Sequence, residues 1–425
     1  MGPDPNPMPD HLLRHISDVF LPNPPERIGV AVSGGGDSMA LLHLMHLFCT
    51  LRGCKAHAVT VDHGLRKEAA DEAQFVKSAC RLLGIRHDTL TWEGWTGEGN
   101  LQKAARDARY ALIGDWATDH GISSVVLAHT ADDQAETVLM RLARRAGVDG
   151  LSAMTTRIQR HGVVWVRPLL SISRSELRSF LQREGIGWIE DPSNQDEAFD
   201  RIKARKALEA LGPLGITAEG LAEVAGHMRE ARKALNWQAF LAAREVVTLD
   251  AGAVVLDEAR LRLLPDEIAR RLIVKAVLWV SGSEYAPRRS AIEALLQGLK
   301  TGPAGTLDGC HVRRIGDKIW LFREYEAIKG ARCGFDDVWD GRWRIEAPQG
   351  AQVQADWALA ALGEKGIAQC PGWRETGRPR QVLLASPAVW QGDAVIAAPC
   401  AGLGAGWHAR IEGGEDTFFA ALLTH

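Results

Sequence analysis

The stretch Ile28-Gly-Val-Ala-Val-Ser-Gly-Gly-Gly-Asp-Ser38 decides the fold. Its first five residues form a short apolar, β-branched run that predicts a buried strand. Residues 33–38 (SGGGDS) then place three glycines and an aspartate between two serines, and residues 39–51 carry apolar side chains at helical spacing. The order of strand, glycine turn and helix predicts that the turn lies at the edge where open parallel sheets bind ligands.

The same alternation of strand and helix signals continues through the first half of the chain. Further strands are expected at 56–61, 85–91, 124–128 and 163–166. Helices are expected at 68–83, 100–120, 132–146, 173–184 and 201–211, several of them ended by a glycine. This rhythm predicts an α/β fold with a parallel sheet and helices on both faces.

The pattern changes after Gly212. Residues 217–247 and 266–299 are expected to be mostly helical, and short strands such as 312–315 and 318–322 follow. We therefore expect three domains: a parallel-sheet domain at 1–212, a helical domain at 213–305, and a small C-terminal α+β domain at 306–425.

Composition excludes several classes of protein. The 425 residues have a net charge of −3, which excludes an overall coat of positive charge but not a local basic groove. No run approaches 18 apolar residues, and residues 1–10 do not have the pattern of a signal peptide. The seven cysteines form no C-x-x-C pair, which favours reduced thiols in a cytoplasmic protein.

The glycine turn has the chemistry of an anion site. Successive backbone N–H groups and a helix N-terminus would face the anion, with phosphate or pyrophosphate as the natural guest. No lysine precedes Ser38, so the turn is not a Walker A loop, and its glycines do not have the spacing of the G-x-G-x-x-G motif. A glycine-rich turn without a ligand is the alternative. The expected nucleotide-binding residues are Ser33, Gly34, Gly35, Gly36, Asp37 and Ser38.

The pattern S-G-G-x-D-S after a strand resembles the PP-loop of the N-type ATP pyrophosphatases. Further stretches are similar to one family of that class, the tRNA(Ile)-lysidine synthetases, most strongly over residues 28–205. They are 62–66 (DHGLR), 100–102 (NLQ), 105–110 (ARDARY), 128–137 (AHTADDQAET), 167–170 (RPLL) and 190–194 (EDPSN).

The resemblance implies an AMP-forming ligase that acts in two steps on the wobble cytidine of a CAU-anticodon tRNA(Ile). ATP adenylates O2 of the base and pyrophosphate leaves; the ε-amino group of free L-lysine then attacks C2 and AMP leaves. The product, lysidine, changes the codon that is read from AUG to AUA. The resemblance also implies Mg²⁺, no membrane partner, and a homodimer or monomer.

Residue roles follow from the same resemblance. Asp37 is expected to offer a hard oxygen to Mg²⁺, although it could simply cap the helix. His129, Asp133 and Glu136 are expected to hold the lysine substrate. Asp133 and Glu136, spaced i and i+3, share one helix face, although carboxylates at a helix start can also be a solvated face.

Arginines are expected around this centre. Arg109 matches an arginine that contacts ATP, and Arg205 one that reaches the active site; without the resemblance both would read as surface residues. The basic cluster at 201–206 is a candidate tRNA phosphate contact. Further backbone-contact candidates are Arg141, Arg144 and Arg145, and Arg374, Arg378 and Arg380 are candidates for gripping the acceptor stem, with tRNA binding assigned to residues 213–425.

Two positions depart from the family pattern, and two other functions stay open. Thr130 stands where the family usually has a second histidine, and Ile202 stands where it has an asparagine. A tRNA thiolase of the same superfamily is the alternative enzyme, but it normally needs a C-x-x-C pair. A nucleotide-binding module without turnover is the alternative from another class.

Overall fold

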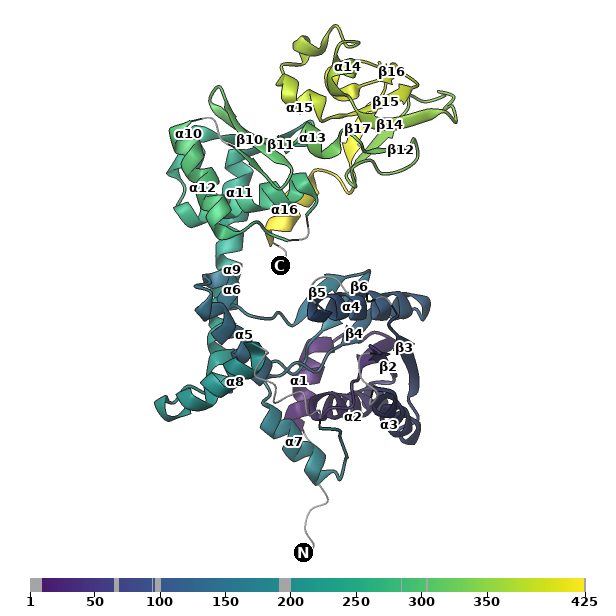
Figure 1. Cartoon of the computed structure of the whole chain (residues 1–425), viewed down its shortest axis with the longest axis vertical. Coiled ribbons are helices and arrows are strands. Elements are labelled where there is room, and N and C mark those ends of the chain that lie inside the picture. Colours follow the sequence, from purple (N-terminus) through teal and green to yellow (C-terminus); the bar gives the residue numbers. More distant parts are fainter. Residues whose placement is uncertain are drawn as a thin grey trace, which may run out of the picture. The chain divides into compact units, whose positions relative to one another are not determined.

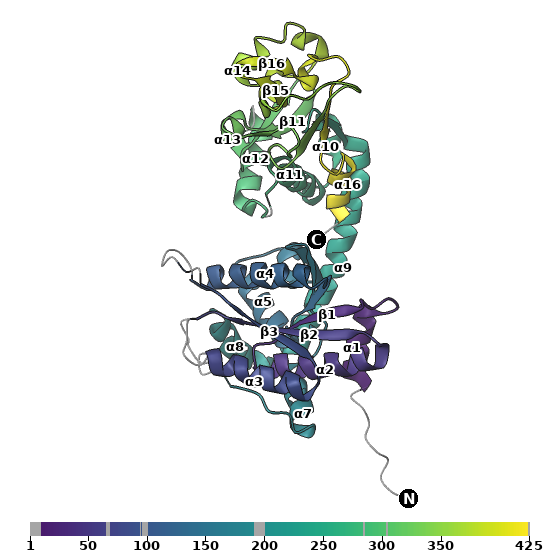
Figure 2. The same ribbon diagram turned by 90° about the vertical axis from the view of Figure 1, so that its right-hand side faces the viewer.

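A computed structural model describes residues 10–64, 69–93, 95, 101–190, 200–283, 285–302 and 305–423. The chain forms two compact units, Met1–Arg232 and Lys233–His425, which are described separately (Figures 1 and 2). Residues 65–68, 96–100 and 191–199, which contain parts of three of the motifs quoted above, lie outside the described residues.

The first unit alternates strands and helices along most of its length. Its strands are β1 (Arg27–Ala31), β2 (Lys55–Asp62), β3 (Arg86–Thr91), β4 (Ser124–Val126), β5 (Arg157–Arg160) and β6 (Val163–Val166). Its helices are α1 (Asp10–Phe20), α2 (Gly36–Arg52), α3 (Ala69–Leu82), α4 (Leu101–Asp119), α5 (Ala131–Ala143), α6 (Val148–Leu151), α7 (Arg174–Arg183) and α8 (Asp200–Leu211). Helix α9 (Ala218–Val246) continues into the second unit.

Among the described residues, the strands of this unit form one sheet in the order β3-β2-β1-β4-β6-β5. All neighbours are parallel except β5, which pairs antiparallel with β6. The connections run outward from β1 to β3 and then return to β4 on the other side of β1. The loops that follow β1 and β4 therefore diverge, which opens a crevice at their carboxyl ends.

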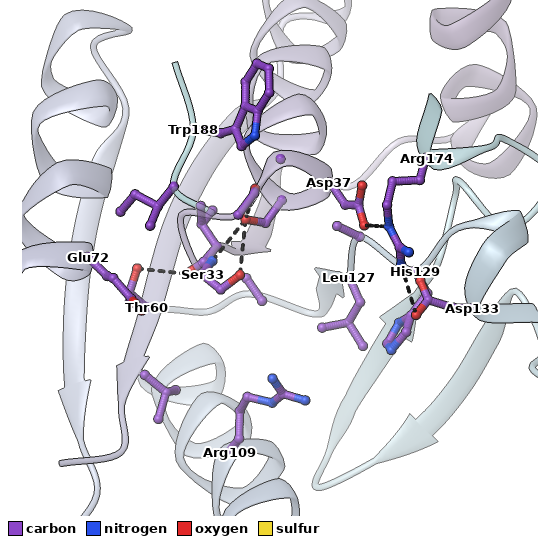
Figure 3. A pocket seen from close by; sticks show the side chains of 18 of the residues that line it. Ser33, Asp37, Thr60, Glu72, Arg109, Leu127, His129, Asp133, Arg174 and Trp188 are labelled. Atoms are coloured by element: carbon purple, nitrogen blue, oxygen red, sulfur yellow. Dashed lines mark hydrogen bonds and ion pairs between the residues drawn. The ribbon is translucent and has the colours of Figure 1, made fainter. Parts of the chain in front are cut away.

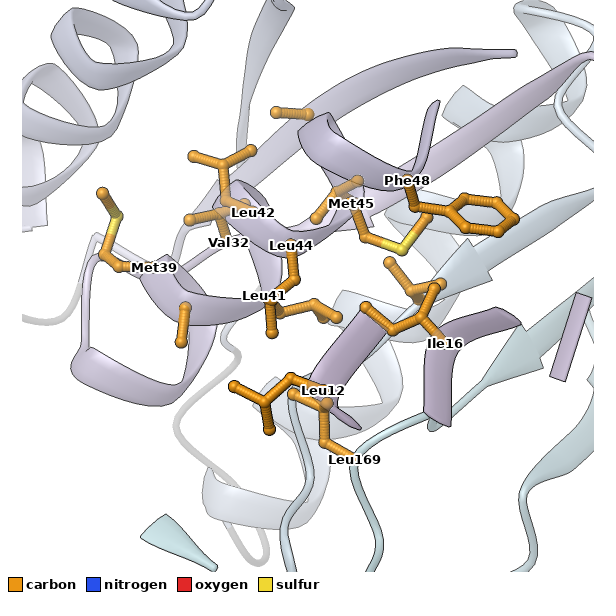
Figure 4. Packing of buried hydrophobic residues seen from close by; sticks show 14 of the residues in the cluster. Leu12, Ile16, Val32, Met39, Leu41, Leu42, Leu44, Met45, Phe48 and Leu169 are labelled. Atoms are coloured by element: carbon orange, nitrogen blue, oxygen red, sulfur yellow. The ribbon is translucent and has the colours of Figure 1, made fainter. Parts of the chain in front are cut away.

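Apolar side chains fill both faces of this sheet. Helices α1, α2, α3 and α7 pack on one face around residues such as Leu12, Met45 and Phe48 (Figure 4). Helix α4 covers the other face through Tyr110 and Trp116. Because side chains alternate along a strand, neighbouring residues of β4 contribute to opposite cores. The predicted α/β fold with helices on both faces is thus confirmed.

The second unit contains three sheets among its described residues. Their orders are β7-β8-β11-β10-β9, β12-β14-β15-β16 and β13-β17. The strands are β7 (Val247–Asp250), β8 (Ala253–Asp257), β9 (Thr306–Leu307), β10 (Cys310–Ile315), β11 (Lys318–Arg323), β12 (Arg332–Gly334), β13 (Trp343–Glu346), β14 (Trp357–Ala361), β15 (Pro387–Gln391), β16 (Ala394–Ala397) and β17 (His408–Ile411). The helices are α10 (Glu258–Leu263), α11 (Asp266–Ser281), α12 (Arg289–Thr301), α13 (Tyr325–Ile328), α14 (Gly363–Ile367), α15 (Arg380–Leu384) and α16 (Asp416–Leu423).

The first of these sheets joins strands from both sides of residue 305. β8 pairs antiparallel with β11, so the hairpin at 247–257 belongs to the same sheet as residues 306–323. A mostly helical region was expected at 213–305, and the hairpin is an addition to it. The division into three domains with separate tasks stays a prediction. Among the described helices, none combines the length and the apolar character that crossing a bilayer requires.

Candidate active site

A cavity of about 780 Å³ lies at the carboxyl ends of β1, β2 and β4 (Figure 3). Its size is within the usual range for pockets that hold small ligands and cofactors. Apolar groups such as Val32 and Leu127 line one part, while the glycine turn and several charged side chains line the rest. The cavity therefore combines a surface for an aromatic ring with groups that bind anions.

The glycine turn leads directly into α2. Gly34 has a φ of 86°, a left-handed conformation that glycine adopts without strain, and Gly35 precedes the first residue of the helix. The Ser38 hydroxyl donates to the Gly35 carbonyl at 2.9 Å and lies 3.2 Å from the Ser33 amide nitrogen, which donates to it. The Ser38 hydroxyl thus holds the turn in shape, and the helix N-terminus is left facing the cavity.

A segment far along the chain braces this turn. The Ile189 amide donates to the Gly34 carbonyl at 2.9 Å, and Gly35 and Ile189 form a parallel bridge. A Cβ atom at Gly34 would lie 3.2 Å from the Ile189 side chain. Trp188 and Ile189 also line the cavity, so the same segment shapes the turn and closes one wall.

Asp37 points into the cavity and is paired with Arg174, the first residue of α7. The Arg174 Nε lies 3.0 Å from Asp37 Oδ2. Burial raises the pKa of the Asp37 carboxyl, and Arg174 opposes that rise. Burial acts to lower the pKa of the Arg174 guanidinium, but the surrounding carboxylates outweigh it and hold the pKa above its ordinary value. Arg174 therefore stays charged.

Asp133 is held at the start of α5 by the residue before the helix. The Thr130 amide and hydroxyl donate to Asp133 Oδ2 at 2.9 and 3.0 Å. The other oxygen, Oδ1, lies 3.8 Å from Arg174 and from Arg201, beyond hydrogen-bond range. Burial acts to raise the Asp133 pKa, but the Arg174 charge, the hydrogen bond from the Thr130 amide and the Arg201 charge hold that pKa below its usual value. Thr130 thus has a defined task here: it fixes the Asp133 carboxylate.

Glu136, one helical turn further, is buried against α8. Arg205 donates to Glu136 Oε1 through Nε at 3.1 Å and through a terminal nitrogen at 2.9 Å. Arg174 lies 3.8 Å from the same oxygen. Burial and the neighbouring Asp133 charge raise the pKa of Glu136, while Arg205 opposes them. The buried Ile202 packs on the inner side of α8, where an apolar residue suits the surroundings.

His129 lies between the end of β4 and α5, and its Nδ1 is buried without a hydrogen-bond partner among the described residues. Burial lowers the pKa of this imidazole; Arg167 and Arg201 add to the effect, and Asp133 opposes it. His129 is therefore neutral near pH 7. A buried polar nitrogen normally has a partner, and a ligand in the adjacent cavity could supply one here.

Arg109 reaches the cavity from α4, opposite the glycine turn (Figure 3). No described residue forms a hydrogen bond or an ion pair with its guanidinium. Burial lowers the pKa of Arg109, and Arg106 and Arg201 repel it further, while Tyr110 raises it. An unpaired cation in a site that already holds an anion-binding turn is suited to phosphate.

The structure brings most of the predicted site residues together. Ser33, Gly35, Gly36, Asp37, Ser38, Arg109, His129, Asp133 and Arg205 all line the cavity. Gly34 and Glu136 lie just behind it, and each contacts residues that line it. Sequence analysis missed Arg174, Trp188 and Ile189. Arg174 follows the helix cap Ser173, and such a position gives no local sign of a role in a site.

The fold and the site together define a PP-loop domain. A family model described as a PP-loop domain matches residues 8–211. A tRNA(Ile)-lysidine synthase of Ruegeria pomeroyi is 52% identical over 97% of this chain and 98% of its own length. One from Wolbachia pipientis is 38% identical over 79% of this chain and 80% of its own. This chain belongs to the tRNA(Ile)-lysidine synthase family.

One solved structure, a U34-tRNA thiolase of Methanococcus maripaludis, is similar at a TM-score of 0.45 and 14% identity, covering 52% of this chain and 78% of that chain.

Proposed function

We propose that this chain is an AMP-forming ligase that joins free L-lysine to C2 of the wobble cytidine in a CAU-anticodon tRNA(Ile). The observation that carries the proposal is the placing of two unlike sites in one cavity. An anion-binding turn with Arg109 lies on one side, and Asp133 with its unbonded Oδ1 lies on the other. Membership of the family supports the same reaction.

The nucleotide would bind along the glycine turn. Backbone N–H groups at residues 33–36 and the N-terminus of α2 would hold the pyrophosphate, and Arg109 would contact the phosphates from α4. The apolar wall near Val32 and Leu127 suits the adenine ring. Once bound in this way, the α-phosphorus is open to attack by O2 of the cytosine, and pyrophosphate leaves.

The donor set also fits Mg²⁺. Asp37 supplies a carboxylate beside the turn, and a magnesium site in such enzymes commonly uses one or two carboxylates together with phosphate oxygens and water. When bound, the ion would offset the negative charge of the pyrophosphate. Asp37 is the described residue that would hold it, and Arg174 is the cation that shares this carboxylate.

The lysine substrate would place its ammonium group at Asp133. Oδ2 is already used by Thr130, so Oδ1 is the oxygen available to a new donor. Glu136 lies on the same face and its pKa is raised by burial, whereas the pKa of His129 is lowered. Glu136 is therefore better matched than His129 to accept the proton that the amine must lose before it attacks.

The tRNA would meet basic side chains beside the cavity. Arg201 and Arg205 face inward from α8, whereas Lys203 and Lys206 point outward and are exposed. These exposed lysines are candidates for phosphate contacts that steer the anticodon loop. The seven free cysteines support a reducing, cytoplasmic setting.

The direct test is incubation of the chain with ATP, Mg²⁺, labelled lysine and a CAU-anticodon tRNA(Ile), followed by mass analysis of the anticodon nucleoside. We expect lysidine at the wobble position, with one AMP and one pyrophosphate released for each lysidine formed. One control omits ATP, and a second control replaces the tRNA(Ile) with a methionine tRNA. Folded protein that binds ATP but adds no lysine would contradict the proposal.

Asp133→Asn separates the two steps of the reaction. The variant keeps the size of the side chain but loses its charge, so the KM for lysine should rise at least tenfold, because a hydrogen bond to a charged partner contributes about 1.5–3 kcal/mol. tRNA-dependent exchange of pyrophosphate into ATP should change less than about threefold, a change worth under 1 kcal/mol. Equal loss in both steps would remove Asp133 from the lysine site.

A further inference from the structure

A second cluster of potential ligands lies away from the cavity, near the amino ends of β2 and β3. His57 on β2 and Asp88 on β3 are diagonal neighbours on the same face of the sheet, since His57 pairs with Arg86 in the register. Trp116, in the last turn of α4, and His120, the residue that follows the helix, cover this face. None of these side chains lines the candidate active site.

Three ligand atoms converge in this cluster. His57 Nε2 lies 2.8 Å from Asp88 Oδ2, His120 Nε2 lies 3.7 Å from the same oxygen, and all three lie within 4.8 Å of one another. Four donors around a tetrahedral zinc ion are about 3.3 Å apart, given bonds of about 2.0–2.1 Å. The two distances to Asp88 Oδ2 bracket that value, and the two imidazole nitrogens lie within 4.8 Å of each other, so side-chain movements of an ångström or so, on the order of the mismatch, would enclose an ion.

The surroundings orient both the carboxylate and one imidazole. His120 donates from Nδ1 to the Trp116 carbonyl at 2.8 Å, which leaves Nε2 with a lone pair directed at the cluster. The Trp116 indole N–H donates to Asp88 Oδ2 at 2.9 Å. A histidine that binds a metal through one ring nitrogen usually donates a hydrogen bond from the other to a backbone carbonyl, a carboxylate or water, which fixes the orientation of the ring.

Burial and neighbouring groups shift the pKa values of His57 and Asp88. Burial lowers the pKa of His57; the hydrogen bond to Asp88 and the charge of that carboxylate oppose this effect, while Arg86 and His120 add to it. Burial acts to raise the pKa of Asp88, but the hydrogen bonds from Trp116 and His57 hold that pKa below its ordinary value. The cluster therefore offers two imidazoles and one carboxylate as ligands.

We propose that His57, Asp88 and His120 form a zinc site, with water in the fourth position. Two imidazoles and one carboxylate are a common ligand set for zinc and a poor one for Mg²⁺ or Ca²⁺. Binding requires the His57 proton to lie on Nδ1, so that Nε2 can coordinate. Asp88 and His120 are about a quarter to a third exposed as side chains, which gives an ion access.

Arg86 is the group that opposes a cation here. One of its terminal nitrogens lies 3.3 Å from His120 Nε2, and its Nε lies 3.9 Å from Asp88 Oδ2. Its side chain is 66% exposed, so it can turn into solvent when an ion enters. The positive charge of Arg86 thus weakens cation binding, so its removal should tighten it. A hydrogen-bond network with only a structural role does not predict such a gain.

To test the proposal, Co²⁺ is titrated into the metal-free full chain in buffer that contains Mg²⁺. The visible absorption of tetrahedral cobalt reports binding, and its loss on addition of Zn²⁺ reports displacement. We expect one site per chain. His120→Ala and Asp88→Asn should each weaken binding by more than about 100-fold, and Arg86→Ala should tighten it roughly tenfold. Zn²⁺ should raise the Tm of the parent chain but not of His120→Ala.

The matched control is His227→Ala, which removes an exposed histidine from α9 and should leave binding unchanged. Circular dichroism of each variant shows whether it is folded. The inference is wrong if the parent chain gives no tetrahedral cobalt spectrum, or if folded His120→Ala and Asp88→Asn bind the ion as tightly as the parent. The site does not depend on the proposed ligase reaction, and neither readout requires tRNA.

Discussion

At the level of single residues, Arg174 faces three carboxylates whose negative charges would otherwise repel one another. It contacts Asp37 at 3.0 Å and lies 3.8 Å from both Asp133 and Glu136. The two halves of the proposed site, one for the nucleotide and one for lysine, therefore share a cation. A substrate ammonium at Asp133 or a magnesium ion at Asp37 would each take over part of its role.

Arg174→Ala should destabilise the first unit by about 3 kcal/mol, because it leaves partly buried carboxylates without their partner. Arg178→Ala is the matched control: it lies one turn along the same helix, is half exposed, and pairs with Glu190 at 3.8 Å. Its loss should cost less than about 0.5 kcal/mol. Calorimetric unfolding of both variants checks the difference, and equal costs would deny Arg174 this role.

His129 predicts a pH dependence of stability. The pKa of His129 in the folded chain is below the unfolded value of 6.5, so its contribution is present above pH 6.5 and is lost as the pH falls. Between pH 6.5 and 5.5 the loss should be at most about 1.4 kcal/mol. His129→Gln should lose less stability than the parent over this interval. Asp37 and Glu136, whose pKa values are raised in the folded chain, add to its stability as the pH falls. They do so in both the parent and His129→Gln, so their contribution cancels when the two proteins are compared.

Sequence reasoning found the residues whose neighbours along the chain give a signal. The turn at 33–38 and the pair Asp133 and Glu136 could be predicted because a strand precedes the turn and helical spacing links the pair. Arg174 could not, because its partner Asp37 is 137 positions away and only the folded sheet brings them together. The hydrogen bonds from Arg205 to Glu136 could not be predicted either, because the two residues are 69 positions apart along the chain.

At the level of elements, the glycine turn is fixed by backbone geometry more than by side chains. Gly34→Ala would place a Cβ at a φ of 86° and 3.2 Å from Ile189. Gly53 is the matched control, since its φ is 72° but no atom lies within 4 Å of a new Cβ.

Both substitutions should cost about 1 kcal/mol of stability from the left-handed backbone. Only Gly34→Ala should also raise the KM for ATP, by roughly tenfold or more, because displacement of the turn misplaces the amides that hold phosphate. Steady-state kinetics at varied ATP concentration check this. An equal effect of Gly53→Ala on the KM would show that the change in KM does not come from displacement of the turn.

The elements that sequence missed have weak or ambiguous patterns. β5 (RIQR) has too few apolar residues to read as a strand, and it forms because it pairs with β6 at the sheet edge. Residues 247–257 lie between two long helical patterns. The β-branched run and the Ala251-Gly252 turn within them favour a hairpin, and pairing with β11 completes it. Parallel strands, by contrast, alternate regularly with helices and were predicted nearly to their ends.

At the level of the whole molecule, the three arginines of the second unit that were predicted to contact the acceptor stem differ in what they already contact within the unit. Arg378 donates to Asp250 at 2.8 Å and to the Cys400 carbonyl at 2.7 Å, so it joins segments within the unit. Arg374 lies over the Trp373 ring at 4.5 Å, and exposed Arg380 pairs with Glu364. Of the three predicted acceptor-stem contacts, Arg374 is thus the best candidate, because Arg378 and Arg380 already pair with carboxylates.

Arg374→Ala should weaken tRNA binding and reduce the slope of log K against log salt by about one, as expected for one lost phosphate contact. Arg378→Ala should instead lower the Tm of the second unit, because it leaves Asp250 without its partner. Filter binding over a range of salt concentrations distinguishes the two. An unchanged slope for Arg374→Ala would exclude that side chain as a phosphate contact.

The bridge between Gly35 and Ile189 has a consequence for the order of synthesis. The phosphate turn is made early on the ribosome, yet its brace emerges more than 150 residues later. A nascent chain that stops short of Trp188 carries the motif without the wall that shapes it. We therefore expect the turn to reach its final shape only late in translation, after Ile189 has left the exit tunnel.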